Sequence, residues 1–403
     1  MTSELSVRRL TDDDFAEYHA LLVSAFLEDP DPEHQPLLRR VLEMERHHGV
    51  FDGAEQVGGC GVMTRTLTVP GGRARPLAAV TQVGVKPGHR RRGIMRMMMR
   101  AQLHALHEAG AEPVAGLEAS EAGIYGRYGY APATEWADIR VPRGTEFRSD
   151  VDTGPDPVRE APRQDALPRL RELHDRAASR VGWLDRSAAV WDFRLADRPR
   201  ADQTAYRFAT HPRGYAVYRL RHGEGRREIR ARVEVLEIQA LDAVAAAALW
   251  RYLLDIDLVS EVQWSSAAVD DPIRWFLADS RRARVEVEDA LWLRIVDLDR
   301  ALPARTYAAE ADVVFQVSDQ LCPWNAGRWR MAVDADGQAD VRRTDAEPGL
   351  SLDITALAAA YLGGTPLAAL ADAGLVTEHH AGSVRTLSRA FLADRSPHCL
   401  VDF

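Results

Sequence analysis

Residues 80–96 of this chain read VTQVGVKPGHRRRGIMR, and this stretch decides how the first domain folds. Its apolar start predicts a strand that ends near Lys86, because the following proline cannot donate to a strand ladder and the glycine favours a turn. Beyond the loop, the spacing of apolar residues predicts an amphipathic helix that starts near Gly93. The predicted buried face of that helix consists of Ile94, Met97, Met98, Ala101 and Ala105.

A short loop rich in arginine and glycine therefore joins a strand to a helix N-terminus. A run of three arginines is by itself more often a solvated basic turn. Here, however, free backbone N–H groups, the positive end of a helix dipole and guanidinium groups come together at one point. The stretch therefore predicts a binding site for phosphate or pyrophosphate.

Length and composition limit the class of protein. A chain of 403 residues exceeds what one hydrophobic core usually serves, so two or three domains are expected. A net charge of −9 disfavours nucleic acid as a partner and is compatible with a cationic one. No apolar run approaches membrane-spanning length, and the first residues lack the pattern of a signal peptide, so we predict no membrane span and a cytoplasmic protein.

Cysteine and histidine patterns argue against a metal site. The three cysteines are far apart and odd in number, which predicts free thiols rather than disulfides or a zinc site. His104 and His107 share one helical face, but that face is polar and no third ligand is evident. We therefore predict that the protein binds no metal.

The rest of the first 145 residues alternates strands with helices. Residues 6–10 read as a strand and a helix follows from Phe15. Residues 57–68 and 80–85 read as hairpin strands, and the Gly93 helix leads to a buried strand at 113–119. A short helix is predicted after Ser120 and Glu121. This order is that of one α/β domain.

The middle of the chain repeats this pattern after a proline-rich linker near residues 153–162. Helices are predicted at 167–178, around Trp191, at 242–254 and at 272–277, and strands at 215–220, 229–238, 262–269 and 285–296. Residues 239–242 join strand to helix without a glycine or a cation, so this domain reads as a degenerate copy without its own cofactor. The last hundred residues read as an α+β module, with strands at 313–317, 329–333 and 339–341 and helices at 354–361 and 384–391.

Two motifs resemble a known family. Arg90, Gly93 and Met95 follow the acetyl-CoA loop pattern of the GNAT N-acetyltransferases, except that Met95 replaces the usual small residue. Together with ASEAGIYGRYGY at 119–130, the loop is similar to the Eis (enhanced intracellular survival) family of actinobacterial acetyltransferases. Segments at 290–295, 361–363 and 402–403 extend the resemblance over the whole chain.

The resemblance implies an architecture and an activity. The expected domains are a catalytic GNAT acetyltransferase domain at 1–145, a degenerate GNAT-like domain at 146–296 and a sterol-carrier-protein-like domain at 297–403. The family is acetyl-CoA-dependent, acetylates aminoglycosides at more than one amine, which gives antibiotic resistance, and can acylate protein lysines. It assembles as hexamers. For this chain the resemblance therefore implies acetyl-CoA as co-substrate, a small polycationic amine as acceptor, and a homohexamer.

Acyl transfer to an amine needs a fixed donor, a stabilised oxyanion and a route for protons. The backbone of the strand at 83–85 can pair with the amides of the donor, and the arginine loop can hold its pyrophosphate. By resemblance, Ser120 and Glu121 also contact the donor. The predicted donor-binding residues are Val83, Gly84, Val85, Arg91, Arg92, Gly93, Ile94, Met95, Arg96, Ser120 and Glu121.

A tyrosine is the predicted general acid. Spacing alone does not choose among Tyr125, Tyr128 and Tyr130, each of which can be a packed aromatic. The family match selects Tyr125. The same resemblance implies that the terminal carboxylate of Phe403 is the general base, although an end of apolar residues can also be a docked terminus without a catalytic role.

The predicted acceptor-binding residues are Glu28, Gln82 and Asp402, which would form an acidic pocket. Two other functions are compatible with the sequence. One is a dedicated protein-lysine acetyltransferase. The other is a non-catalytic lipid-binding or scaffold protein that uses the C-terminal module, and the presence of both the arginine loop and Tyr125 speaks against it.

Overall fold

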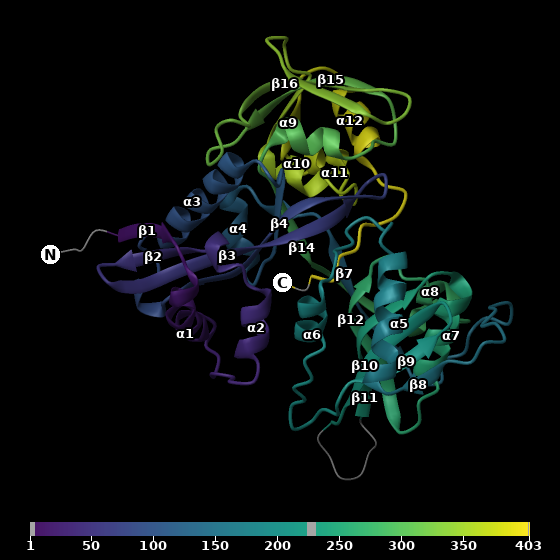
Figure 1. Ribbon diagram of the computed structural model, residues 1–403. Helices are drawn as coiled ribbons and strands as arrows, with labels where there is room; N and C mark the ends of the chain where they lie inside the picture. Colours follow the sequence, from purple (N-terminus) through teal and green to yellow (C-terminus); the bar gives the residue numbers. More distant parts are fainter. Residues whose placement is uncertain (1–4, 224–230, 402) are drawn as a thin grey trace. The chain divides into compact units, whose positions relative to one another are not determined.

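The structure is a computed structural model and describes residues 5–223, 231–401 and 403 (Figure 1). It divides into two compact units. The first contains the residues up to Thr134, Leu184–Arg194 and Ala290–Phe403, and the second contains Glu135–Trp183 and Leu195–Asp289. In the described part of the chain, no helix is long and apolar enough to cross a membrane.

The first unit is built on a seven-stranded sheet. Its strands, in spatial order, are β1 (Leu5–Arg9), β2 (His48–Asp52), β3 (Glu55–Val69), β4 (Arg73–Val85), β5 (Val114–Glu118), β14 (Leu291–Ile295) and β6 (Ala131–Pro132). All neighbours are antiparallel except β4 and β5. A parallel pair needs a crossover, and α3 (Ile94–Ala109) provides it. The predicted strand, loop and helix are therefore confirmed.

The buried face of α3 differs from the prediction. Ile94 and Met98 are buried as expected, but Met97, Ala101 and Ala105 are only half-buried. The face turned to the core is completed by Met99, Gln102, Leu103 and Leu106. The helix packs closely on β3 at Gly58, where an added Cβ would lie 2.6 Å from Cγ2 of Ile94. This contact fixes which face of α3 turns toward the core. The sequence alone does not determine that face, because several consecutive residues near Met98 are apolar.

The remaining helices of the first domain flank the sheet and its loops. They are α1 (Phe15–Phe26), α2 (Gln35–Val41), α4 (Ala122–Tyr125) and α6 (Ala188–Arg194). The segment that carries α6 comes from the middle of the sequence, yet the Asp185 carboxylate accepts a hydrogen bond of 2.7 Å from the Thr66 amide of β3. Val190 of α6 packs in the core cluster that contains Tyr18 of α1.

The second unit also holds a seven-stranded sheet. Its order is β13 (Arg284–Asp289), β7 (Glu135–Pro142), β12 (Val259–Ala268), β11 (Ala231–Ala240), β10 (Gly214–Arg221), β9 (Arg207–His211) and β8 (Arg159–Ala161). Only β11 and β12 are parallel, and α7 (Ala243–Leu254) connects them. Asp242 caps α7, and its carboxylate accepts from the Ala245 amide at 2.8 Å. At this helix N-terminus a carboxylate stands where the first domain has Gly93.

The two sheets exchange one strand each. Each sheet contains a strand whose neighbours in the sequence belong to the other sheet. β7 follows the first domain but pairs with β12 and β13. β14 is separated from β13 by Ala290 alone, yet it pairs with β5 and β6. The prediction of one strand over 285–296 was therefore wrong, because the chain passes from one sheet to the other at Ala290.

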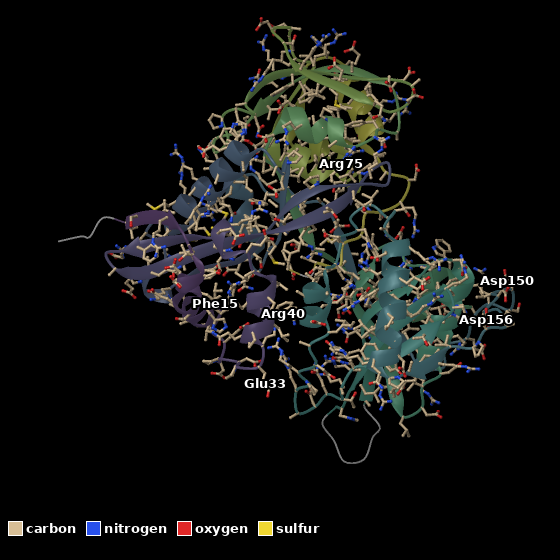
Figure 2. All side chains as sticks on the ribbon, in the orientation of Figure 1. Phe15, Glu33, Arg40, Arg75, Asp150 and Asp156 are labelled. Atoms are coloured by element: carbon tan, nitrogen blue, oxygen red, sulfur yellow. The ribbon has the colours of Figure 1, made fainter. Side chains whose placement is uncertain are left out.

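The C-terminal module has a five-stranded sheet and three larger helices. The sheet order is β17 (Ala339–Arg343), β16 (Gly327–Val333), β15 (Ala311–Ser318), β18 (Leu350–Asp353) and β19 (Val376–Glu378), with α10 (Ile354–Ala360), α11 (Leu367–Asp372) and α12 (Ser383–Phe391). Arg75 of β4, labelled in Figure 2, donates from Nε to the Ala304 carbonyl at 2.8 Å. Buried Arg294 of β14 pairs with buried Asp319 at 2.7 Å. These contacts join the module to the first sheet.

Candidate active site

The candidate site lies where two neighbouring strands, β4 and β5, diverge; we call this place the fork. The parallel ladder of β4 and β5 has only two pairs, Ala78 with Ala115 and Ala79 with Gly116. Beyond them the two strands diverge, although β4 continues to Val85. The edge of β4 that faces the fork therefore carries backbone N–H and C=O groups that an extended ligand can pair with.

A β-bulge redirects β4 inside this fork. Gln82 and Val83 stand opposite the single residue Cys60 of β3. Gln82 has a φ of 53°, a left-handed conformation that is uncommon for a residue with a side chain. The hydroxyl of Tyr18 donates to the Gln82 carbonyl at 2.5 Å, which stabilises the bulge. Bulges of this kind re-aim side chains next to active sites.

The larger of the two hollows in the fork, which we call the donor cleft, has a volume of 750 Å³. Ten of the eleven predicted donor-binding residues line it: Val83, Gly84, Val85, Arg91, Gly93, Ile94, Met95, Arg96, Ser120 and Glu121. The exception is Arg92, whose guanidinium pairs with Asp52 of β2 at 2.7 Å. Arg92 therefore holds the loop to the sheet rather than facing the cleft.

The arginine loop has a backbone shaped for an anion. Arg91 and Gly93 have φ values of 63° and 82°. The Met97 amide donates to the Gly93 carbonyl at 3.1 Å, so the amides of Ile94 to Arg96 precede the first hydrogen bond of α3. A Cβ added at Gly93 would meet nothing within 4 Å, which leaves room for a ligand at the helix end. These features fit a pyrophosphate.

A smaller hollow of 240 Å³, which we call the acceptor cavity, adjoins the donor cleft. Its lining includes Gln82, which is one of the three predicted acceptor-binding residues, and Phe403, the predicted general base. Glu28 follows the end of α1, is exposed and is not among the lining residues. Asp402 lies outside the described residues. Phe26, Val83, Ser120 and Tyr125 line both hollows, so the two meet at these side chains.

The structure separates the three tyrosines that spacing could not. Tyr125 of α4 is 7% exposed and lines both hollows. Tyr128 lines the donor cleft but not the acceptor cavity, and Tyr130 is fully buried and lines neither hollow. Burial raises the pKa of Tyr125 to about 12, and nearby Cys60 adds to the effect. The Tyr125 phenol is therefore protonated at neutral pH.

The last residues of the sequence are docked against the first domain. Cys399, Leu400 and Val401 are buried. The Phe403 ring packs against the cluster that contains Tyr18, and the Arg65 guanidinium lies 6.0 Å from the ring centre. A docked chain end is confirmed, whereas a catalytic role for the α-carboxylate of Phe403 stays a prediction.

Metal ligands do not gather in the described part of the chain, where no group of three or more histidine, cysteine, aspartate or glutamate side chains could hold an ion. Cys60, Cys322 and Cys399 are buried thiols, and none of them forms a disulfide, as predicted.

Family models match three parts of the chain. Residues 6–133 and 182–295 each match an acetyltransferase (GNAT) domain, and residues 298–400 match a sterol carrier protein domain. The predicted fold class, two GNAT domains followed by a sterol-carrier-like domain, is therefore confirmed.

Whole-length relatives narrow the family further. An uncharacterized N-acetyltransferase of Streptomyces coelicolor is 38% identical over 98% of both chains. The N-acetyltransferase Eis of Mycobacterium tuberculosis is 34% identical over 95% of this chain and 96% of that protein. The crystal structure of Eis1 from Mycobacterium abscessus aligns with a TM-score of 0.86 at 33% identity, covering 99% of this chain and all of that one. The chain belongs to the Eis family of N-acetyltransferases.

Two residues that the sequence did not point to also line the candidate site. Gln320 and Leu321 of the C-terminal module line the donor cleft. Their loop is fixed because the Asp319 carboxylate accepts from the Leu321 and Cys322 amides, and Nε2 of His104 donates to the Leu321 carbonyl at 3.1 Å. No local pattern marks these residues as functional. The sterol-carrier-like module thus forms part of the donor cleft.

Glu118 is the missed residue that the sequence could have revealed. It ends β5 and lines the acceptor cavity together with Thr81 and Phe26. A carboxylate at the end of a buried strand, two residues before the predicted site residue Ser120, is a recognisable signal. Its position gives the acceptor cavity of this Eis-family enzyme a negative group.

Proposed function

We propose that this N-acetyltransferase moves the acetyl group of acetyl-CoA to amines of polycationic acceptors such as aminoglycosides, at more than one position. The observation that carries the proposal is that the donor cleft and the acceptor cavity meet at Val83, Ser120 and Tyr125. An amine in the smaller hollow and a thioester in the larger one would be held in contact there, which replaces an encounter in solution with a fixed approach. A homohexameric assembly and a cytoplasmic location remain predictions.

Different residues of the donor cleft would bind different parts of acetyl-CoA. The amides at the start of α3 and the guanidinium groups of Arg91 and Arg96 would hold the pyrophosphate. Neither arginine forms a salt bridge within the described residues, so both charges are available. The open edge of β4 at Val83 and Val85 would pair with the amides of the donor arm. Acetyl-CoA itself supplies the electrophilic thioester carbonyl and the thiolate leaving group.

Tyr125 would give its proton to the departing sulfur. A phenol with a pKa of about 12 is a weak acid toward a solvated thiol, whose pKa is near ~8.5. Desolvation corrects this mismatch, because burial raises the pKa of any thiol. The same core raises the pKa of the Cys60 thiol to about 12. Partial burial of the sulfur in the donor cleft would raise the pKa of the leaving thiol as well, which reduces the mismatch with Tyr125.

The α-carboxylate of Phe403 would take a proton from the ammonium group of the acceptor, and the neutral amine that results would attack the thioester carbonyl. Phe403 lines the acceptor cavity, and its partly buried ring packs against the core cluster that contains Tyr18. A free α-carboxyl group has a pKa near ~3.3 to 3.7, so burial of the carboxylate or of the amine must bring the two pKa values closer. The neighbouring Glu118 would favour binding of a cationic acceptor over a neutral one.

Arg91→Glu should raise the Kd of acetyl-CoA at least about tenfold, because it replaces an attractive charge at the pyrophosphate by a repulsive one. Arg100→Glu is the matched control, since Arg100 lies on α3, directly after the arginine loop, is exposed and lines neither hollow. Isothermal titration calorimetry at two salt concentrations measures both variants. Equal affinities for Arg91→Glu and Arg100→Glu would overturn the assignment of the donor cleft.

A further inference from the structure

Helix α1 lies close to β3 and β4 because both strands carry a glycine where the helix crosses them. A Cβ added at Gly59 of β3 would lie 2.4 Å from Cε2 of Tyr18. A Cβ added at Gly84 of β4 would lie 3.0 Å from Cβ of Ala25. These two glycines stand opposite each other in the ladder of β3 and β4. The close approach brings the fully buried ring of Tyr18 next to the bulge in β4.

The Tyr18 hydroxyl is a permanent hydrogen-bond donor at the bulge. Burial raises the pKa of Tyr18 well above that of a free tyrosine, and nearby Cys60 adds to the effect. The hydroxyl therefore keeps its proton and donates to the Gln82 carbonyl at 2.5 Å. The edge of the Tyr18 ring meets the His47 ring, at 5.4 Å between ring centres, so the phenol is held in place. The Gln82 carbonyl is thus fixed on the side of β4 that faces α1.

Gln82 needs such a partner because its backbone is strained. Its φ of 53° lies in the left-handed region, which costs free energy for a residue with a side chain. Strained conformations of this kind persist only where neighbouring groups hold them. Without the hydrogen bond from Tyr18, the peptide that joins Gln82 to Val83 would be free to turn toward an ordinary extended conformation.

The Gln82 carbonyl and the Val83 amide belong to one peptide group. That peptide is trans, so its C=O and N–H point in opposite directions. Tyr18 belongs to one core cluster, whereas Val83 packs against another, which contains Tyr125. The Val83 amide therefore points away from α1, toward the side on which the donor cleft and the acceptor cavity meet. An amide at that place can stabilise negative charge on the thioester carbonyl oxygen.

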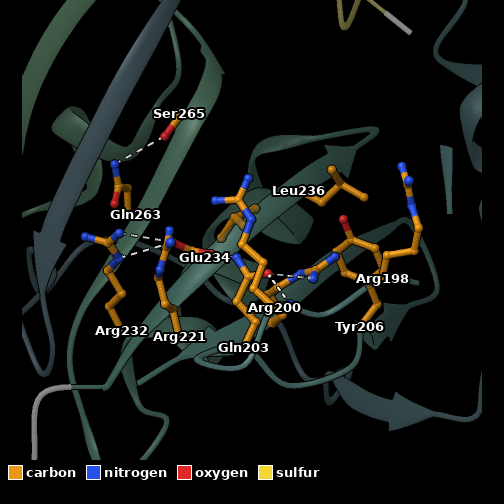
Figure 3. Close-up of a pocket in the computed structure, with 12 residues that line it drawn as sticks. Arg198, Arg200, Gln203, Tyr206, Arg221, Arg232, Glu234, Leu236, Gln263 and Ser265 are labelled. Carbon is orange, nitrogen blue, oxygen red and sulfur yellow. Dashed lines mark hydrogen bonds and ion pairs between the residues drawn. The ribbon is translucent and has the colours of Figure 1, made fainter. Parts of the chain in front are cut away.

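The second GNAT domain has a bulge at the corresponding place but a different backbone there. The ladder of β10 and β11 skips Leu236, which lies two residues beyond the last parallel pair of β11 with β12. Figure 3 shows Leu236 in the lining of a pocket. The φ of Leu236 is not positive, and α5 (Arg163–Arg176), the first helix of this unit, contains no tyrosine. The domain without an arginine loop thus also has no left-handed residue at its bulge.

We propose that Tyr18 is a positioning residue for acetyl transfer, which holds the peptide between Gln82 and Val83 so that the Val83 amide stays aimed at the thioester carbonyl of the donor. The inference rests on the acetyl transfer proposed above. Tyr18 lines neither hollow, so it acts through the peptide and touches neither donor nor acceptor. The proposal adds no proton transfer to the reaction. It concerns only the hydrogen bond that the carbonyl oxygen accepts as negative charge develops on it.

Tyr18→Phe tests this proposal, because it removes the hydroxyl and keeps the ring on Gly59. The matched control is Tyr361→Phe, which removes the hydroxyl of another fully buried tyrosine that donates to a backbone carbonyl, that of Ala301, at 3.0 Å. Tyr18→Phe should lower kcat at least about tenfold, which is less than the ~100-fold cost of deleting an oxyanion donor, since the amide is displaced rather than removed. The Kd of acetyl-CoA should change by less than about twofold in both variants, and Tyr361→Phe should keep its kcat.

Gln82→Gly supplies a rescue that a merely structural role would not give. Glycine adopts a positive φ without strain, so the peptide no longer depends on Tyr18 to the same degree. The loss of kcat caused by Tyr18→Phe should therefore be at least about threefold smaller in a Gln82→Gly background. Each ratio compares two proteins that share the same residue at position 82.

Infrared difference spectroscopy gives a second readout that needs no acceptor. Acetyl-CoA that is isotope-labelled at the carbonyl carbon should show its carbonyl band at lower frequency when bound to the intact protein than in solution. Tyr18→Phe should move the band back toward the solution value, and Tyr361→Phe should not. If Tyr18→Phe does not fold by itself, the same comparison is made in the Gln82→Gly background, where a smaller shift in the same direction is expected.

The two readouts separate the role of Tyr18 from the proposed function. Full turnover by a folded Tyr18→Phe variant, or an equal loss of kcat in Tyr361→Phe, would overturn the positioning role. So would a bound carbonyl band that is not shifted in the intact protein or that does not respond to loss of the Tyr18 hydroxyl. An intact protein that acetylates no amine would instead contradict the proposed function, and the infrared bands would still decide whether Tyr18 positions the amide.

Discussion

Tyr125→Phe should lower kcat at pH 7.5 by about 100-fold or more, which is the range that a positioned general acid contributes. The loss arises because the leaving thiolate receives no proton, while the phenyl ring keeps its edge contact with Tyr130, at 6.1 Å between ring centres. Because the phenyl ring stays in place, the KM for acetyl-CoA should change by less than about threefold. Steady-state thiol release measures both constants.

Tyr128→Phe is the matched control, since that phenol lines only the donor cleft, and its kcat should fall by less than about threefold. The pH profile gives a second check. Because the pKa of Tyr125 is raised to about 12, the acid stays protonated as pH rises, and kcat should not fall between pH 8 and 10. Undiminished turnover by Tyr125→Phe, or a fall in kcat with an apparent pKa well below 10, would exclude Tyr125 as the acid.

Two residues, Gly-Ser, added after Phe403 should lower kcat by about 100-fold or more and leave acetyl-CoA affinity within about twofold. The extension moves the α-carboxylate away from the acceptor cavity, while the docked segment that contains Leu400 and Val401 keeps its contacts. Calorimetry measures donor binding, and thiol release measures turnover.

Phe403→Leu provides the control for the extension, because it alters the ring contact and keeps the carboxylate in place. Its kcat should be reduced much less than that of the extended chain. A folded, extended variant with full activity would show that the carboxylate only docks the chain end.

The arginine loop and its flanking strand and helix could be predicted because local residues determine them. Pro87 and Gly88 end β4, and Gly93 begins α3 with a positive φ. The choice among the three tyrosines could not be made in this way, since it depends on which phenol reaches both hollows. That property arises from the divergence of β4 and β5, which is a long-range feature.

The other differences between the sequence-based predictions and the structure also arise from contacts between residues far apart in the sequence. The break at Ala290 and the exchange of β7 and β14 depend on pairing between strands far apart in sequence. The contribution of Gln320 to the donor cleft depends on the buried pair of Arg294 and Asp319, which joins the C-terminal module to β14.

The proposed reaction is tested most directly by thiol release from acetyl-CoA across a panel of amines: aminoglycosides, linear polyamines, lysine-containing peptides and monoamines of similar size. We expect the highest kcat/KM for acceptors with several amines, and mass spectrometry should find more than one acetyl group on a single aminoglycoside. Preference for the peptides would favour the protein-lysine acetyltransferase. Equal rates with monoamines, or no thiol release with any amine, would contradict acetyl transfer to polycations by this site.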